Sequence, residues 1–146
     1  MKSNTRTFLT ISIVIIMMNC SSSADPIPDL TAEEKQMNML AKTWKLGTVT
    51  YGDEVITDRF SNFLLTFTKD KSYAAAGNLG DYDYEPFKAS GSWGFKDGNL
   101  DLIERNDNVV MGVQVTEGTL DLVFTISEAN GRVAGLGAYH FEMVPQ

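Results

Sequence analysis

Cysteine and histidine are almost absent from this chain, which has only Cys20 and His140. One cysteine cannot form an internal disulfide, and a zinc cluster built from Cys and His is excluded. Basic residues are also few, because 12 Lys and Arg face 19 Asp and Glu, for a formal net charge of −7. Nucleic-acid binding needs a basic surface, so we expect no nucleic-acid partner.

Long hydrophobic runs are lacking as well. The apolar stretch from Phe8 to Met18 is shorter than the ~20 residues that a helix needs to span a bilayer. It follows Lys2 and Arg6, and a positive start before a short apolar core is typical of a secretory signal peptide. The small-residue cleavage pattern of an ordinary signal peptide is missing, and Cys20 follows instead, ahead of a serine-rich stretch.

This arrangement resembles a bacterial lipoprotein signal. In that family the cysteine becomes the first residue of the mature protein and carries the lipid, which implies a signal peptide at 1–19 and lipid attachment at Cys20. Residues 20–30, rich in serine and proline, then form a flexible tether. We expect a lipid-anchored protein of the cell envelope, at the outer membrane, on its periplasmic face or at the cell surface. The alternative is a free thiol after an ordinary signal peptide or an uncleaved anchor.

The remaining residues, 31–146, have the length of one domain. The sequence TAEE at 31–34 is a capping box, in which Thr31 and Glu34 satisfy each other's backbone N–H groups. Apolar residues follow at helical spacing: Met37, Leu40, Ala41 and Trp44. We predict a short helix from about Ala32 to Lys42 that lies on the domain as a lid or plug.

From Thr43 onward the apolar residues alternate with a period of two, most clearly in TLDLVFTIS at 119–127. This alternation predicts eight main strands, with a further short piece at 55–58 and one long connection at 77–86. The strands are 43–51, 62–68, 71–76, 87–96, 99–104, 109–116, 119–127 and 132–143. Consecutive strands with tight turns pair with their neighbours, and closure removes the exposed edges. We predict an all-β, eight-stranded antiparallel up-and-down barrel with a short N-terminal helix.

Three stretches resemble the small lipocalin-like lipoproteins of Bacteroidetes. They are LAKTWKL at 40–46, FLLTFT at 63–68 and SGSWGFKDGNLDL at 90–102. The resemblance implies a lipocalin-like barrel for residues 31–146. In the family this tryptophan closes the base of the barrel, so Trp44 is expected to have a structural role. The resemblance does not specify a ligand.

Small residues cluster in two of the predicted strands, at 74–77 and 134–138, and small side chains inside a barrel leave volume. With nearby aromatic residues they predict a pocket for a small apolar or amphipathic molecule, lined by Tyr73, Trp93, Phe95 and Tyr139. An eight-stranded barrel equally permits a filled interior. Both faces of 132–143 carry apolar residues, and the opposite phase would replace Tyr139 by His140 in the pocket.

The segment DYDYE at 81–85 supports a different function, in which a filled barrel acts as an interaction or assembly module of the cell envelope. Tyr82 and Tyr84 would then bind the partner. The acids of this segment imitate the first half of a calcium loop, but Pro86 stands where such a loop needs glycine, so we expect no metal.

Catalytic motifs are not found in the sequence. It lacks a nucleophile–base pair, a metal cluster and a phosphate-binding loop, and His140 is interpreted as a surface or hydrogen-bonded residue. We therefore expect no enzyme, no catalytic residue and no cofactor.

Overall fold

The computed structural model describes residues 29–81, 84–133 and 135–146. The predicted signal peptide, Cys20, nearly all of the tether and Tyr82 lie outside these residues. One α-helix, α1 (Ala32–Leu40), precedes nine strands. The strands are β1 (Thr43–Tyr51), β2 (Glu54–Val55), β3 (Leu64–Phe67), β4 (Ser72–Ala76), β5 (Ser90–Lys96), β6 (Asn99–Arg105), β7 (Val110–Val115), β8 (Leu120–Ile126) and β9 (Gly137–Pro145). Within the described part of the chain, no helix has the length and apolar character needed to cross a membrane.

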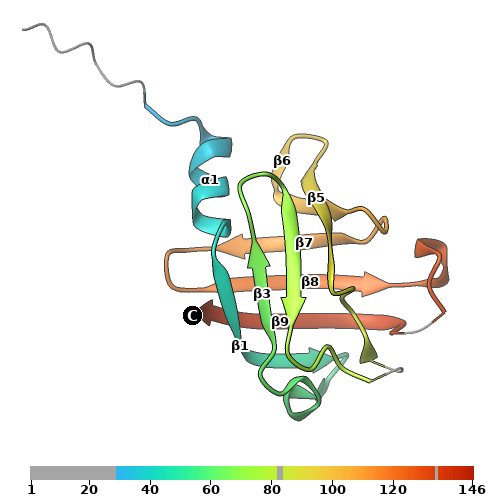
Figure 1. Cartoon of the computed structure of the whole chain (residues 1–146). Helices are drawn as coiled ribbons and strands as arrows, with labels where there is room; N and C mark the ends of the chain where they lie inside the picture. Colours follow the sequence, from blue (N-terminus) through green and yellow to red (C-terminus); the bar gives the residue numbers. More distant parts are fainter. Residues whose placement is uncertain (1–28, 82–83, 134) are drawn as a thin grey trace, which may run out of the picture.

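The strands form one antiparallel sheet that closes into a barrel (Figure 1). From β3 to β9 each strand pairs with the next one along the chain, and β1 pairs with both β3 and β9. The short strand β2 adds only to the far end of β1, at Thr50 and Tyr51. The predicted eight-stranded up-and-down barrel with an N-terminal helix is therefore confirmed.

The helix α1 begins at the predicted capping box. The Glu34 N–H donates to Thr31 Oγ1 at 3.2 Å, and the Thr31 N–H donates to Glu34 Oε2 at 2.7 Å. Leu40 ends the helix two residues earlier than predicted and is fully buried. Trp44 is also fully buried, and its Nε1 donates to the Leu40 carbonyl at 3.0 Å. The helix and the expected tryptophan thus close one end of the barrel together.

The barrel has two distinct ends. We call the end that holds α1, with the turns β3–β4, β5–β6 and β7–β8, the helix end. The opposite end, here the loop end, holds the connections 77–89, 106–109 and 127–136. The 3₁₀ turn η1 (Thr57–Phe60) connects β2 to the start of β3.

Alternation along the last two strands decides which side chains face the interior. In β8 the apolar residues are buried at every second position, and in β9 Tyr139, Phe141 and Met143 are buried. His140 and Glu142 therefore lie on the outer surface of the barrel. This settles the phase that the apolar pattern of 132–143 left open.

The largest differences from the predicted strand starts are at β5 and β9. Strand β5 starts at Ser90 and not at 87, so Phe87 belongs to the preceding connection. Strand β9 starts at Gly137 and not at 132, because Ser127 caps a 3₁₀ turn, η3 (Glu128–Asn130). Gly131 and Gly135 then take positive φ values of 70° and 66°, which interrupt an extended strand. The segment 127–136 is thus a second long connection where a tight hairpin was predicted.

Candidate functional site

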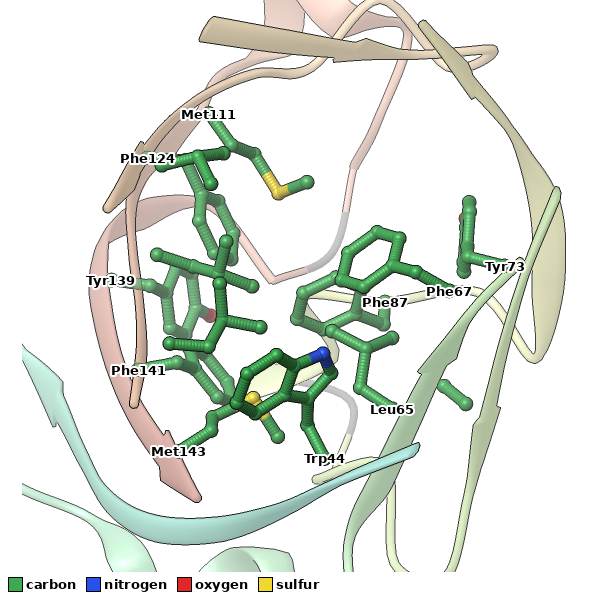
Figure 2. Close-up of a cluster of buried hydrophobic side chains, with 14 of the residues drawn as sticks. Trp44, Leu65, Phe67, Tyr73, Phe87, Met111, Phe124, Tyr139, Phe141 and Met143 are labelled. Atoms are coloured by element: carbon green, nitrogen blue, oxygen red, sulfur yellow. The ribbon is translucent and has the colours of Figure 1, made fainter. Parts of the chain in front are cut away.

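Phe87 occupies the centre of the barrel although no strand carries it. Its side chain is fully buried, and Figure 2 shows it between the wall with Tyr73 and the wall with Phe124 and Tyr139. The Phe87 ring centroid lies 5.4 Å from that of Phe141 and 5.5 Å from that of Phe124. Residues 84–89 therefore insert an aromatic side chain into the centre of the barrel.

Arg105 brings a charged group into the same interior. It lies at the end of β6, two residues after the buried Ile103, so the strand period turns its side chain inward. Arg105 Nε donates to Asp107 Oδ1 at 3.0 Å, and its Nη2 donates to the other carboxylate oxygen. Arg105 Nη1 donates to the Pro86 carbonyl at 2.9 Å, and the guanidinium lies 4.8 Å from the Phe87 ring centroid.

Arg132, from the segment 127–136, also contacts the connection that carries Phe87. Its Nη2 donates to the Glu85 carbonyl, and its Nη1 lies 3.5 Å from Asp107 Oδ2. The side chains of Arg105, Asp107 and Arg132 are 0%, 3% and 8% exposed. Two guanidinium groups thus share one carboxylate, which leaves an excess of one positive charge in this cluster.

Arg132 Nη1 is buried and makes no hydrogen bond beyond its 3.5 Å ion pair with Asp107. Two further polar atoms, Tyr73 Oη and Tyr139 Oη, are buried without any hydrogen-bond partner among the described residues. Each such atom costs about 1–3 kcal/mol, so buried polar groups usually have a partner, a water or a ligand. Burial raises the pKa of Tyr73, although the charge of Arg105 opposes the shift. Burial also raises the pKa of Tyr139. Both phenols therefore remain protonated and able to donate.

The carboxylate of Asp107 stays charged within this cluster. Burial by itself raises the pKa of Asp107, but the hydrogen bonds from Arg105 and the charges of Arg105 and Arg132 outweigh burial. The pKa of Asp107 consequently lies below its ordinary value. The ion pair with Arg105 is therefore present at neutral pH.

Tyr84, a residue predicted for partner binding, is half-buried on the outer side of the 77–89 connection. Its ring meets the Tyr51 ring edge to face, with centroids 5.1 Å apart, and the Arg59 guanidinium lies 4.5 Å from its centroid. Arg59 Nη1 also pairs with Asp81 Oδ2 at 2.8 Å. These contacts hold the connection against the barrel wall.

The structure distributes the four predicted pocket residues over two regions. Tyr73 and Tyr139 lie on opposite walls around Phe87, whereas Trp93 packs on Phe67, and its Nε1 donates to the Ser72 carbonyl at 3.0 Å. Phe95 is half-buried and lies against Trp93, with centroids 5.4 Å apart. That these residues line a pocket stays a prediction.

Sequence reasoning missed Phe87, Arg105, Asp107 and Arg132. One signal was present, because Arg105 continues the inward phase of Ile103, and a charged residue at an inward position indicates a buried polar contact. The other three residues lie in connections, where side-chain direction follows no period that a sequence reveals.

A second group of polar side chains lies outside the barrel. Asp121, His140 and Glu142 project from β8 and β9, and their donor atoms all lie within 4.8 Å of one another. These are residue types that can hold a divalent metal ion.

Comparison with known proteins adds no functional assignment. A scan against protein-family models finds no match to this chain, and a search of curated proteins finds none either.

Proposed function

We propose that this chain is a lipocalin-like lipoprotein, anchored through Cys20, that holds a small amphipathic molecule inside its barrel. The observation that carries the proposal is that two buried phenols, Tyr73 Oη and Tyr139 Oη, have no hydrogen-bond partner among the described residues. Arg132 Nη1 is buried as well and makes no hydrogen bond, only its 3.5 Å ion pair with Asp107. An acidic or strongly polar head group would satisfy these donors. It would also balance the excess positive charge that Arg105 and Arg132 leave beside Asp107.

The apolar part of the molecule would take the place of the Phe87 ring. Beside the Arg105 guanidinium, the neighbours of that ring are aromatic: Phe63, Tyr73, Phe124 and Phe141. Phe87 belongs to a connection and not to a wall strand, so it can leave without breaking the barrel ladder. In this proposal residues 84–89 are a lid that closes on the empty barrel and opens for the ligand.

The position of α1 supports an anchored arrangement. The first described residues, Asp29 and Leu30, lead into α1 at the helix end of the barrel (Figure 1). A tether from Cys20 would therefore join the barrel at the end opposite the proposed lid. The lid would remain free to exchange a ligand while the protein stays on the membrane.

The binding test uses a fluorescent fatty acid, cis-parinaric acid, beside its methyl ester, which has the same chain without the charge. We expect the acid to bind more tightly than the ester, and Arg132→Gln to remove that preference while Asp107 keeps its pair with Arg105. Lys96→Gln is the control, because Lys96 forms an exposed pair with Glu104 at 3.2 Å. The proposal would be contradicted if neither the acid nor its ester bound to the protein.

The anchoring test is independent of the ligand. A bacterial host that expresses the full chain is fed a radiolabelled fatty acid, and we expect label on the wild type but not on Cys20→Ser. A labelled Cys20→Ser variant, or an unlabelled wild type, would contradict lipid attachment at this cysteine.

A second candidate function is favoured by the same aromatic centre. Phe87, Phe63, Phe124 and Phe141 form a continuous set of ring contacts, as expected of a filled barrel. Such a barrel would act in the cell envelope through its loops, with the exposed side of Tyr84 as one contact. The two functions differ in what removal of the Phe87 ring does to ligand binding.

A further inference from the structure

The outer surface of β6–β9 carries a hollow that the proposed ligand function does not use. Its volume is about 590 Å³. It is lined by Asp101, Gly112, Val113, Gln114, Asp121, Val123 and His140. Asp121 and His140 line it, and Glu142 lies beside them. We propose that these three residues bind one divalent ion of the zinc class at the edge of this hollow.

The strand register explains why these three side chains meet. Asp121 and Glu142 are directly opposite each other in the β8–β9 ladder, and His140 is two residues before Glu142. Because side chains two apart share a face of a strand, all three project outward while Leu122 and Phe141 face the core. Two hydrogen-bonded strands therefore hold the three donors on one rigid surface.

The distances suit a zinc ion. His140 Nε2 lies 3.3 Å from Asp121 Oδ1. Ligands of tetrahedral zinc, at bonds of about 2.0–2.1 Å, are about 3.3–3.4 Å apart, so these two atoms already have that spacing. The donor atoms of all three residues lie within 4.8 Å of one another. Glu142 is exposed, so rotation of its side chain can shorten the remaining distances.

The charge of the two carboxylates and the open side of the hollow also favour a zinc ion. Among the described residues, His140 and Asp121 form the one ion pair of this cluster, at 3.3 Å. Neither Asp121 nor Glu142 has the charged nitrogen of a described Lys or Arg within 4.0 Å. A divalent cation would neutralise both carboxylates. The imidazole favours zinc over magnesium or calcium, which prefer ligand sets of oxygen alone. The hollow leaves a fourth position for water or another ligand.

The test exploits the single histidine of the chain. The full chain, without a histidine tag, is treated with EDTA, exchanged into detergent micelles and titrated with ZnCl₂ while the imidazole resonances are followed by NMR. We expect these resonances to change and to saturate at one zinc per chain. Because the readout is the imidazole of His140, zinc held by Cys20 would not produce it.

Matched variants define the site. Asp121→Asn and Glu142→Gln remove one donor each on an exposed surface, and each is expected to weaken zinc binding at least about 10-fold. Glu104→Gln, on the outside of β6, should bind zinc as the wild type does, and MgCl₂ should leave the imidazole unchanged. The proposal is overturned if excess zinc leaves the imidazole unchanged, if both donor variants bind like the wild type, or if magnesium has the same effect as zinc.

Discussion

Arg105 and Asp107 form a buried ion pair at the loop end, with Arg105 Nε 3.0 Å from Asp107 Oδ1. Arg105 is the last residue of β6, and Asp107 lies in the short turn before β7, where the Asn108 N–H donates back to the Arg105 carbonyl at 2.9 Å. Arg105 Nη1 donates a hydrogen bond to the Pro86 carbonyl of the proposed lid. One side chain thus joins the barrel wall, its counter-charge and the lid.

The first prediction concerns loss of this counter-charge. Asp107→Asn keeps the size of the side chain but leaves Arg105 buried without a negative partner. We expect the free energy of unfolding to fall by about 3–5 kcal/mol, measured by urea denaturation at neutral pH. The control is Glu104→Gln, because Glu104 pairs with Lys96 on the partly exposed outer surface, and loss of that pair should cost only about 0–1 kcal/mol. Equal small losses in both variants would mean that the Asp107 pair adds little.

The second prediction is a pH dependence of stability. The pKa of Asp107 is lower in the folded than in the unfolded state, where an ordinary Asp has a pKa of about 3.9. The unfolded state therefore binds more protons, and stability rises with pH in this range. The contribution of Asp107 should be complete above about pH 5 and be lost as pH falls below the unfolded pKa and through the folded one. Urea denaturation at a series of pH values should show the gap between wild type and Asp107→Asn narrowing in acid, and a constant gap would contradict this.

The third prediction separates the two candidate functions. Phe87→Ala removes a fully buried ring and should cost about 3–5 kcal/mol of stability under either function. If Phe87 occupies the ligand position, the variant should also bind cis-parinaric acid more tightly than the wild type, because no ring must leave first. Phe67→Ala, which truncates an equally buried ring on strand β3, should destabilise without that gain. Lost stability with no improved binding in Phe87→Ala would favour the filled barrel.

The fourth prediction tests how Gly135 and Arg132 hold Glu85 of the proposed lid. Gly131 and Gly135 both have positive φ, but a Cβ at 131 would meet no atom within 4 Å, whereas one at 135 would lie 2.5 Å from the Glu85 carbonyl oxygen. Gly131→Ala should cost about 1–2 kcal/mol, the strain of a left-handed residue. Gly135→Ala should cost more and displace Glu85 from Arg132. Hydrogen exchange at residues 84–88 should therefore accelerate only in Gly135→Ala, and equal protection in both variants would oppose a lid held at this point.

The barrel could be predicted because its signals are local and repeated. In 119–127 the apolar residues alternate over the whole strand, and a face of this kind must be buried. The capping box at 31–34 likewise depends only on residues close in sequence. The boundaries of β5 and β9 were wrong because apolar or small residues continue beyond the point where the ladder stops. There, the glycines at 131 and 135 and the capped turn η3 decide the backbone path.

Most of the candidate site depends on contacts between distant segments. Phe87 is one apolar residue among many in the sequence, and only closure of the barrel turns its connection inward. Arg132 and Glu85 meet across 47 positions of the chain. Pairing of this kind has no local pattern, so neither the arginine cluster nor the inward path of Phe87 could be predicted.

The sequence alone therefore determined the strand period, the helix start and the closed eight-stranded architecture, because each follows from burying one face of a short segment. The tertiary structure alone decided that Phe87 fills the centre, that Arg105 and Arg132 share Asp107, and that Asp121, His140 and Glu142 meet outside. Those positions depend on strand register and loop path, which are set by the packing of the whole barrel and not by neighbours along the chain.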